Sequence, residues 1–289
     1  MKNLARKSFR NKKGIEPVVA TVIITGTIIA LVTIAMVFAN NLLTATIAQG
    51  DFNSAKQYMQ TVAMQIDDVA WQLGQTETVS YSSTYGTVNA LNYAVLTYKI
   101  NVTANGVTIA KFPPLNTTII YFYMRTSYYS VSNNYFSQVW PSQVLHPINY
   151  GSSAPVATVF AVENMPMSDG SYIRVVAAPV IRFINSIITT TQTTDAYFLY
   201  LPLLSLASSP RLSQSVTLRA NSISVLNASS KVRASIGVAV SFPESVYGYS
   251  NMFFHFPSIS QVITAPAGYN SYVFELYTAS VAVSLGANI

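Results

Sequence analysis

Cysteine is absent from the 289 residues, and charged residues make up only 9% of them. The absence of cysteine excludes disulfide bonds and thiolate metal sites. Charged residues are about a quarter of an ordinary soluble domain, so this surface carries few groups that repel a neighbouring protein. Tyrosine, by contrast, occurs 19 times. Low charge with many hydroxyl groups suits a surface that packs against copies of itself or is exposed to extreme conditions.

The positive charge is confined to the start of the chain. The formal net charge is +6, and the first 14 residues contain six cations and no acid. Without them, ten Lys and Arg balance ten Asp and Glu. A basic protein raises the question of nucleic-acid binding, but the remaining cations are scattered and form no patch. We therefore predict no nucleic-acid partner.

A long uncharged segment follows the basic start. Residues 17–50 carry no charge, and Val18–Phe38 consists mostly of Val, Ile, Thr and Ala. This stretch is long enough to span a bilayer, which needs about 20 apolar residues. The basic flank places the N-terminus in the cytoplasm. We predict a single-pass membrane segment over residues 18–38, with the chain from Asp51 onwards outside the cell.

The junction between the two parts is Lys12-Lys13-Gly14-Ile15-Glu16-Pro17. A short basic leader that ends in Gly directly before an apolar helix resembles the class III signal peptides of archaeal type IV pilins and archaellins. The resemblance implies that a prepilin peptidase cuts between Gly14 and Ile15, with recognition residues Lys12 and Lys13. It also implies that the apolar helix remains on the mature chain and forms the core of a filament.

Two other interpretations of the apolar segment stay open. An uncut signal anchor would keep the whole N-terminus in the membrane. A secretory signal peptide cut at Val37-Phe38-Ala39 would remove the segment, although its apolar region is normally only about 7–15 residues long.

The helix is predicted to continue beyond the membrane. Apolar residues recur at intervals of three and four, which places them on one stripe of a helix. They are Phe52, Ala55, Met59, Val62, Ile66, Val69 and Leu73. Gly74 is a reasonable stop. We expect a helix within residues 15–74, of which Pro17–Leu73 would be about 85 Å long at 1.5 Å per residue, with the stripe covered by the rest of the protein.

Residues 75–289 are predicted to form a β-rich head. Thr103-Ala104-Asn105-Gly106 separates two alternating runs, a strong hairpin signal. Phe183–Thr190 fits a helix or a strand, and residues 126–154 resemble a long surface loop. The fold class is therefore α+β, a long apolar helix followed by an all-β, sandwich-like head. The expected strands are Ala94–Asn101, Val107–Phe112, Thr117–Arg125, Pro155–Val162, Tyr172–Ile181, Ala196–Leu203, Ser215–Leu226, Lys231–Phe242, Asn251–Phe256 and Ser271–Ser284.

The search for a catalytic site is negative at the level of motifs. No nucleophile elbow, phosphate-binding loop or His-Glu-x-x-His motif is present. His146 and His255 are isolated, and a single His without nearby carboxylates is a poor metal site. The acids of the head are widely spaced: Glu77, Glu163, Asp169, Asp195, Glu244 and Glu275. We predict no enzyme, no cofactor and no metal. Asp67-Asp68 either face solvent or contact the head.

Three sequons are candidate glycosylation sites on an exported chain: Asn101-Val-Thr, Asn116-Thr-Thr and Asn227-Ala-Ser. The tyrosines of segments 121–150 and 247–277 are candidates for an adhesive surface, because Tyr suits interfaces. Core packing accounts for at least half of them.

The resemblance thus implies a structural subunit of an archaeal type IV pilus-type surface filament, assembled through its N-terminal helix and a candidate for adhesion. The resemblance implies as partners other pilin subunits in a homo- or hetero-polymer, a prepilin peptidase, an assembly ATPase and a membrane platform. The alternative is a membrane-anchored extracellular binding or cell-envelope protein that does not polymerise. A pocket lined by Tyr and by Trp71 or Trp140 would favour that alternative. An extracellular enzyme ranks last.

Overall fold

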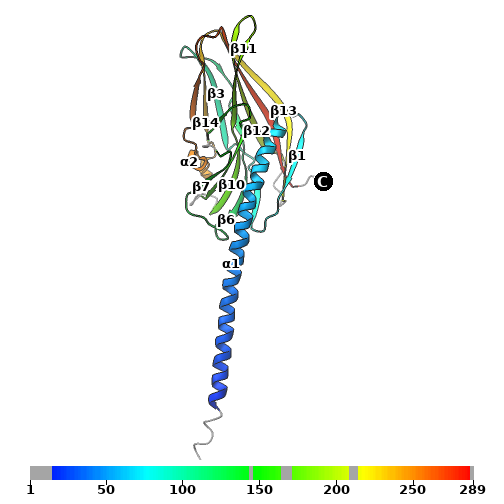
Figure 1. The fold of residues 1–289 in the computed structure, drawn as a ribbon, viewed down its shortest axis with the longest axis vertical. Helices are drawn as coiled ribbons and strands as arrows, with labels where there is room; N and C mark the ends of the chain where they lie inside the picture. The colour runs from blue at the N-terminus through cyan, green and yellow to red at the C-terminus, as the bar shows by residue number, and fades with distance from the viewer. Residues whose placement is uncertain (1–14, 143–145, 164–170, 208–213, 287–289) are drawn as a thin grey trace, which may run out of the picture. The chain divides into compact units, whose positions relative to one another are not determined.

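The structure is a computed structural model that describes residues 15–142, 146–163, 171–207 and 214–286. It has the predicted fold class, α+β, with one long N-terminal helix followed by a head of β-strands (Figure 1). The chain divides into two compact units. The first runs to Ile47 and the second comprises Ala48–Ile289.

Helix α1 runs from Ile15 to Ala70 and is long and apolar enough to cross a membrane. It ends before the predicted stop at Gly74. The amide of Gln72 donates to the carbonyl of Val69 at 3.1 Å, and the amide of Gly74 donates to the carbonyl of Ala220 at 3.1 Å. Gly74, with φ 82°, therefore belongs to the chain reversal that leads into the head.

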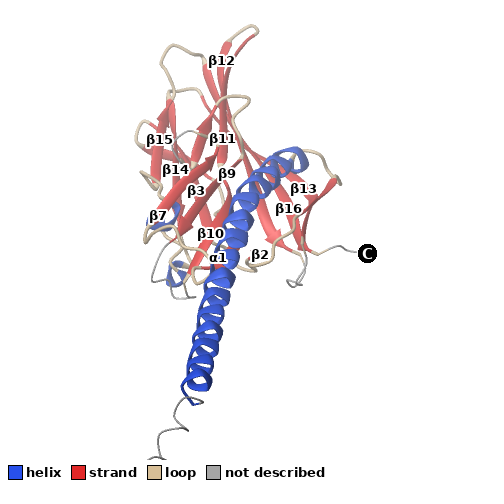
Figure 2. Ribbon diagram, turned by 60° about the horizontal axis from the view of Figure 1, so that its bottom comes forward, coloured by secondary structure: helices blue, strands red, loops and turns tan. Residues whose placement is uncertain are grey.

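The predicted apolar stripe is buried over the part of α1 that belongs to the second unit. Six of its seven residues are at most 4% exposed: Phe52, Ala55, Met59, Val62, Ile66 and Val69. Leu73 is 70% exposed, because the helix has already ended at Ala70. This part of α1 packs with strands of two sheets (Figure 2).

The described strands form three sheets. The six-stranded sheet has the order β1 (Thr76–Ser80), β13 (Ser215–Ser230), β16 (Ser271–Leu285), β12 (Thr193–Leu206), β11 (Ile181–Thr189) and β8 (Ile148–Tyr150). A five-stranded sheet has the order β2 (Gly86–Ala90), β6 (Ile120–Arg125), β10 (Tyr172–Pro179), β9 (Ala157–Glu163) and β7 (Tyr135–Trp140). The third sheet has the order β15 (Ser260–Thr264), β14 (Ala234–Ser241), β3 (Leu96–Ala104) and β4 (Val107–Lys111), and β5 (Leu115–Thr117) also pairs with β3.

Two apolar cores lie on opposite faces of the five-stranded sheet. Every residue of β9 is buried, and its central residues Val159–Val162 form an apolar run without polar alternation, as expected for a strand covered on both faces. Val159 and Ala161 pack into the core that contains α1, whereas Phe160 and Val162 pack into the core that contains β3 and β14. The head is therefore layered, and β9 and β10 lie between two apolar layers.

The predicted hairpin is confirmed. Strands β3 and β4 are joined through Asn105 and Gly106, whose φ angles of 49° and 76° are both positive. Such angles are those of a tight hairpin turn, and Asn-Gly adopts them most readily. The ambiguous segment Phe183–Thr190 forms most of β11.

Two predictions about the head are wrong. Asn251–Phe256 is not a strand: it contains helix α2 (Asn251–Phe254), which follows the short 3-10 helix η1 (Ser245–Tyr247). The side chain of Ser250 caps α2 by accepting from the amide of Met252. The expected loop 126–154 contains β7 and β8. Strand β7 pairs with β9, and its side chains are half-buried. Strands β1, β2, β5 and β15 are not among the expected strands.

Candidate functional site

The candidate site is the exposed apolar surface of α1 in the first unit. Every residue from Val18 to Leu43 is exposed, and the exposed fraction reaches 70% at Phe38. Fifteen of these side chains are large and apolar: Val18, Val19, Val22, Ile23, Ile24, Ile28, Ile29, Leu31, Val32, Ile34, Met36, Val37, Phe38, Leu42 and Leu43. They cover all sides of the helix. A helix that is apolar all round requires apolar surroundings, either lipid or other helices.

Three threonine hydroxyls of the first unit donate hydrogen bonds to carbonyls one turn earlier in the same helix. Thr27 donates to the carbonyl of Ile23 at 2.9 Å, and Thr33 donates to the carbonyl of Ile29 at 2.8 Å. Thr46 makes the same contact with Leu42 at 2.8 Å. An unsatisfied polar group is costly in an apolar medium, so these internal hydrogen bonds adapt a Thr-rich helix to lipid or to a bundle of helices.

Small residues interrupt the apolar surface at Gly26 and Ala30. A Cβ atom added at Gly26 would meet no heavy atom within 4 Å. Nothing inside a single copy of the chain therefore requires glycine at this position. Small residues at a spacing of four allow two helices to approach closely.

The predicted processing residues lie at the edge of what the structure describes. Lys12, Lys13 and Gly14 lie outside the described residues, and Ile15 is the first residue of α1. Cleavage after Gly14 would thus leave a chain that begins with its helix.

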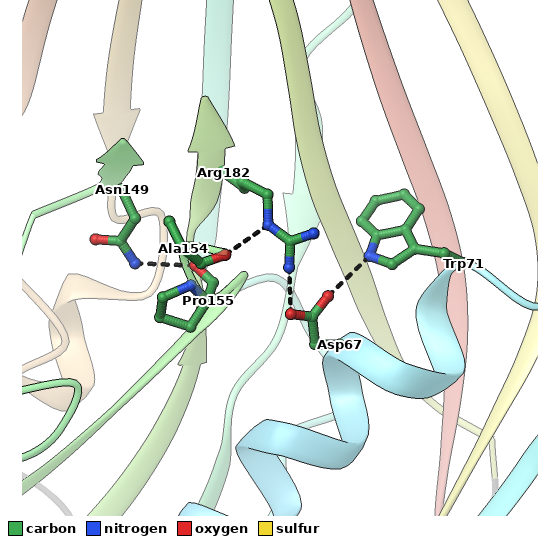
Figure 3. Close-up of polar contacts among 6 residues, drawn as sticks. All are labelled: Asp67, Trp71, Asn149, Ala154, Pro155 and Arg182. Carbon is green, nitrogen blue, oxygen red and sulfur yellow. Dashed lines mark hydrogen bonds and ion pairs between the residues drawn. The ribbon is translucent and has the colours of Figure 1, made fainter. Parts of the chain in front are cut away.

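The other end of α1 is fixed to the head by an ion pair. The carboxylate of Asp67 is paired with the guanidinium of Arg182 in β11, and their side chains are 26% and 14% exposed. The indole Nε1 of Trp71 donates to Asp67 Oδ1 at 3.1 Å, and Arg182 Nε donates to the carbonyl of Ala154 at 2.5 Å (Figure 3). This resolves the open question about Asp67, which contacts the head, while Asp68 is exposed.

A second polar contact fixes α1 close to where the second unit begins. Asp51 Oδ2 accepts hydrogen bonds from the hydroxyl of Ser83 at 2.9 Å and from the amides of Thr84 and Tyr85 at 2.7 and 2.9 Å. The first charged residue after the apolar segment therefore holds the loop between β1 and β2. Sequence reasoning missed both this contact and Arg182. The one feature of the sequence that could have indicated Asp51 and Arg182 is the rarity of charged residues in this chain.

The sequon asparagines lie on three different strands and form no common site. Asn101 is half-buried on β3, whereas Asn116 on β5 and Asn227 on β13 are exposed. Thr118, the hydroxyl residue of the second sequon, is only 3% exposed. In the third sequon, both Asn227 and Ser229 are exposed, so it is the sequon most accessible in the folded chain.

Three acids of the head accept hydrogen bonds from the backbone or from neighbouring hydroxyls. Glu163 accepts from the hydroxyl of Ser130 at 2.6 Å and from the amide of Val131 at 2.8 Å. Asp195 accepts from the hydroxyl of Tyr197, and Glu275 accepts from that of Tyr277 at 2.5 Å. Asp169 lies outside the described residues. No group of three or more His, Asp and Glu that would hold a metal ion occurs among the residues described.

Neither histidine belongs to a metal-binding group among the described residues. His255 stacks on Phe136, with 3.9 Å between ring centroids, and desolvation lowers its pKa. His146 is half-buried next to β8. The described residues line a pocket of about 280 Å³ that includes Tyr58 and Tyr81 and another of about 190 Å³ that includes Asn116. Trp71 and Trp140 line neither of them.

No family model matches the chain, and no curated protein and no solved structure matches it. The functional argument therefore rests on the chain itself.

Proposed function

We propose that the chain is a structural subunit of an archaeal type IV pilus-type surface filament, assembled through its N-terminal helix. The observation that carries the proposal is the apolar surface of α1 between Val18 and Leu43, which is exposed on all sides. Burying a Val, Leu or Ile side chain is worth about 1.5–3 kcal/mol. Fifteen large apolar side chains on one helix would strongly favour transfer of that helix from water into a helix bundle or a bilayer.

The path to the filament follows from the order of the segments. The basic residues before Gly14 hold the N-terminus in the cytoplasm, and the apolar helix spans the membrane. A prepilin peptidase cuts between Gly14 and Ile15, and an assembly ATPase with its membrane platform transfers the helix from lipid into the filament. The β-rich head then faces the outside, where its low charge permits close contacts between copies. The proposed role is structural and not enzymatic.

An anchored surface protein that does not polymerise would use the same helix as a permanent membrane span. The two functions differ in what surrounds the helix, and Gly26 offers a test. Gly26→Leu keeps the segment apolar, and a Cβ atom at this position meets no heavy atom of the same copy within 4 Å, so membrane insertion should be unchanged. Leucine there would obstruct close helix packing.

The experiment measures the protein in the membrane fraction and in filaments sheared from cells and pelleted. We expect Gly26→Leu to reduce pelleted filaments by about tenfold or more, which corresponds to 1.4 kcal/mol per contact, with an unchanged membrane pool. The matched control is Ile28→Leu, which alters an exposed side chain of the same helix and should assemble normally. If the unmodified protein stays in the membrane as a monomer, the filament proposal is wrong and the anchored protein replaces it.

A further inference from the structure

Helix α1 covers only part of the face of the six-stranded sheet on which it packs. The helix ends at Ala70, and the ring of Trp71 packs edge-on against Tyr200 of β12, with 5.2 Å between ring centroids. Strand β12 extends beyond the end of α1 (Figure 2). Past Tyr200 the same face carries side chains open to solvent, among them Val225 and Ile188, which are 45% and 46% exposed. This part of the face therefore lacks a covering layer in the described part of the chain.

Two adjacent rows of side chains run across the uncovered part of the face. Paired residues on neighbouring strands point to the same face of a sheet. The registers give the row nearer to α1 as Arg182, Tyr200, Tyr277 and Val225, and the next row as Ile184, Phe198, Glu275 and Asn227. The intervening residues Leu226 and Ala228 pack on the other side of the sheet, against the core that contains β3 and β14. Asn227 of the third sequon thus lies on the same face as the aromatic residues.

The aromatic residues of these rows form a continuous surface. Tyr200 and Tyr277 stack with 4.8 Å between ring centroids and an angle of 14° between their planes, and Phe198 lies 6.5 Å from Tyr277. All three are half-buried. Beside them, Glu275 Oε2 accepts from the hydroxyl of Tyr277 at 2.5 Å. An apolar surface rimmed by polar groups is typical of a binding site.

The chemistry of this surface suits a sugar. The face of an aromatic ring carries partial negative charge, which attracts the C–H groups on the face of a pyranose ring. An ionised carboxylate has about four positions that accept hydrogen bonds, and Tyr277 occupies one of those of Glu275. The remaining positions can accept from sugar hydroxyls.

A glycan on Asn227 would be tethered next to this surface. Asn227 lies directly opposite Glu275, and Tyr277 is its diagonal neighbour on β16, a separation of about 7–8 Å. Strand β1 covers only Ser215–Arg219 of β13, so Asn227 lies on the sheet's edge in the described part of the chain and has room for a bulky group. A short tether gives an effective concentration in the millimolar range, which favours an attached glycan over a separate ligand of the same chemistry.

We propose that Asn227 carries a glycan and that this glycan packs on the aromatic surface formed by Phe198, Tyr200 and Tyr277. The glycan then covers the part of the sheet that α1 leaves open. The inference goes beyond the proposed function and does not depend on it, because the sequon and the aromatic surface both belong to the head.

The test uses the full-length protein isolated from its native host. Asn227→Gln and Ser229→Ala each remove the sequon by changing a different exposed residue. Mass spectrometry measures the glycan on Asn227, and hydroxyl-radical footprinting measures the oxidation rates of Phe198 and Tyr277. Tyr128, which is 37% exposed between β6 and β7, is the internal reference.

The matched control variant is Asn116→Gln, which removes a sequon on β5 in a different sheet. We expect a glycan on Asn227 in the unmodified chain. Both variants that remove its sequon should raise the oxidation of Phe198 and Tyr277 several-fold and leave Tyr128 unchanged. Asn116→Gln should leave all three rates unchanged.

Four results would overturn the inference. The first is an Asn227 without a glycan, and the second is a glycan whose loss leaves the oxidation of Phe198 and Tyr277 unchanged. The third is a rise in Asn227→Gln that is absent from Ser229→Ala, which would be an effect of the asparagine side chain itself. The fourth is an equal rise at Tyr128, which would show a general loosening of the head. The formation of filaments is scored separately and tests only the proposed function.

Discussion

Asp67 in the last turns of α1 and Arg182 in β11 form an ion pair that is largely buried within the second unit. The pair joins the helix to the six-stranded sheet, and Trp71 donates a further hydrogen bond to the same carboxylate. Together with the buried apolar stripe and the contacts of Asp51, this ion pair holds the C-terminal part of α1 on the head.

Replacing one partner should destabilise the head. Arg182→Ala leaves the carboxylate of Asp67 without its cation, and we expect the free energy of unfolding to fall by about 1–3 kcal/mol. Asp68→Asn alters the exposed neighbouring acid and should change the free energy of unfolding by less than about 0.5 kcal/mol. Urea unfolding followed by circular dichroism measures both. Equal effects of the two variants would contradict this role of the ion pair.

The buried stripe of α1 predicts a second contrast. Ile66 is fully buried and Met64 on the same helix is 47% exposed. Ile66→Ala should lower the free energy of unfolding by about 2–5 kcal/mol because it leaves a cavity, whereas Met64→Ala should cost less than about 0.5 kcal/mol. If Met64→Ala is the more damaging change, the face of α1 that packs on the head has been assigned wrongly.

Glycosylation, where the host carries it out on the folded chain, should favour Asn227. Asn227 and Ser229 are both exposed, whereas Asn101 is half-buried and Thr118 of the remaining sequon is buried. Mass spectrometry of peptides from protein isolated from its native host measures the occupancy of each site. Asn227→Gln should remove most of the attached glycan mass. Full occupancy of Asn101 with an unmodified Asn227 would contradict the ranking.

Buried tyrosines should make the head sensitive to alkali. Burial raises the pKa of Tyr98 well above its usual range, and the hydrogen bond to Glu275 raises that of Tyr277 to about 12. Because the pKa of each phenol is higher in the folded than in the unfolded chain, its contribution to the free energy of unfolding is complete below a pH of about 10. This contribution is lost as the pH rises through the folded-state pKa.

Thermal unfolding at a series of pH values tests this dependence. The melting temperature should fall between pH of about 10 and about 12. Tyr98→Phe removes one phenol, whose hydroxyl donates to the carbonyl of Pro179 at 2.9 Å, and the fall should become shallower. A melting temperature that is constant over this range would show that the phenols ionise without cost.

The sequence predicted the features that depend on local pattern. The long uncharged run and the three-four spacing from Phe52 to Val69 predicted the helix and its buried face, and Asn105-Gly106 predicted the hairpin. The error at Asn251–Phe256 has a physical cause: alternating aromatic residues fit a strand, but the cap at Ser250 and burial of the adjacent Phe253 and Phe254 favour one helical turn.

Other features depend on contacts between distant segments. Arg182 lies 115 residues from Asp67, and nothing in either local sequence indicates their pairing. The partial cover of β11 and β13 is likewise a property of sheet order. The length of β1 and β8 relative to their neighbours determines which residues stay unpaired, and strand pairing of this kind is not visible in a single sequence.

The most direct measurement is the N-terminal sequence of the protein in material sheared from cells and pelleted. The account predicts that the chain begins at Ile15 and that the pelleted material is filamentous. A chain that begins at Ile15 but remains a membrane-bound monomer would contradict the filament. A chain that begins at Met1 or at Asn40 would contradict processing after Gly14 and the function proposed from it.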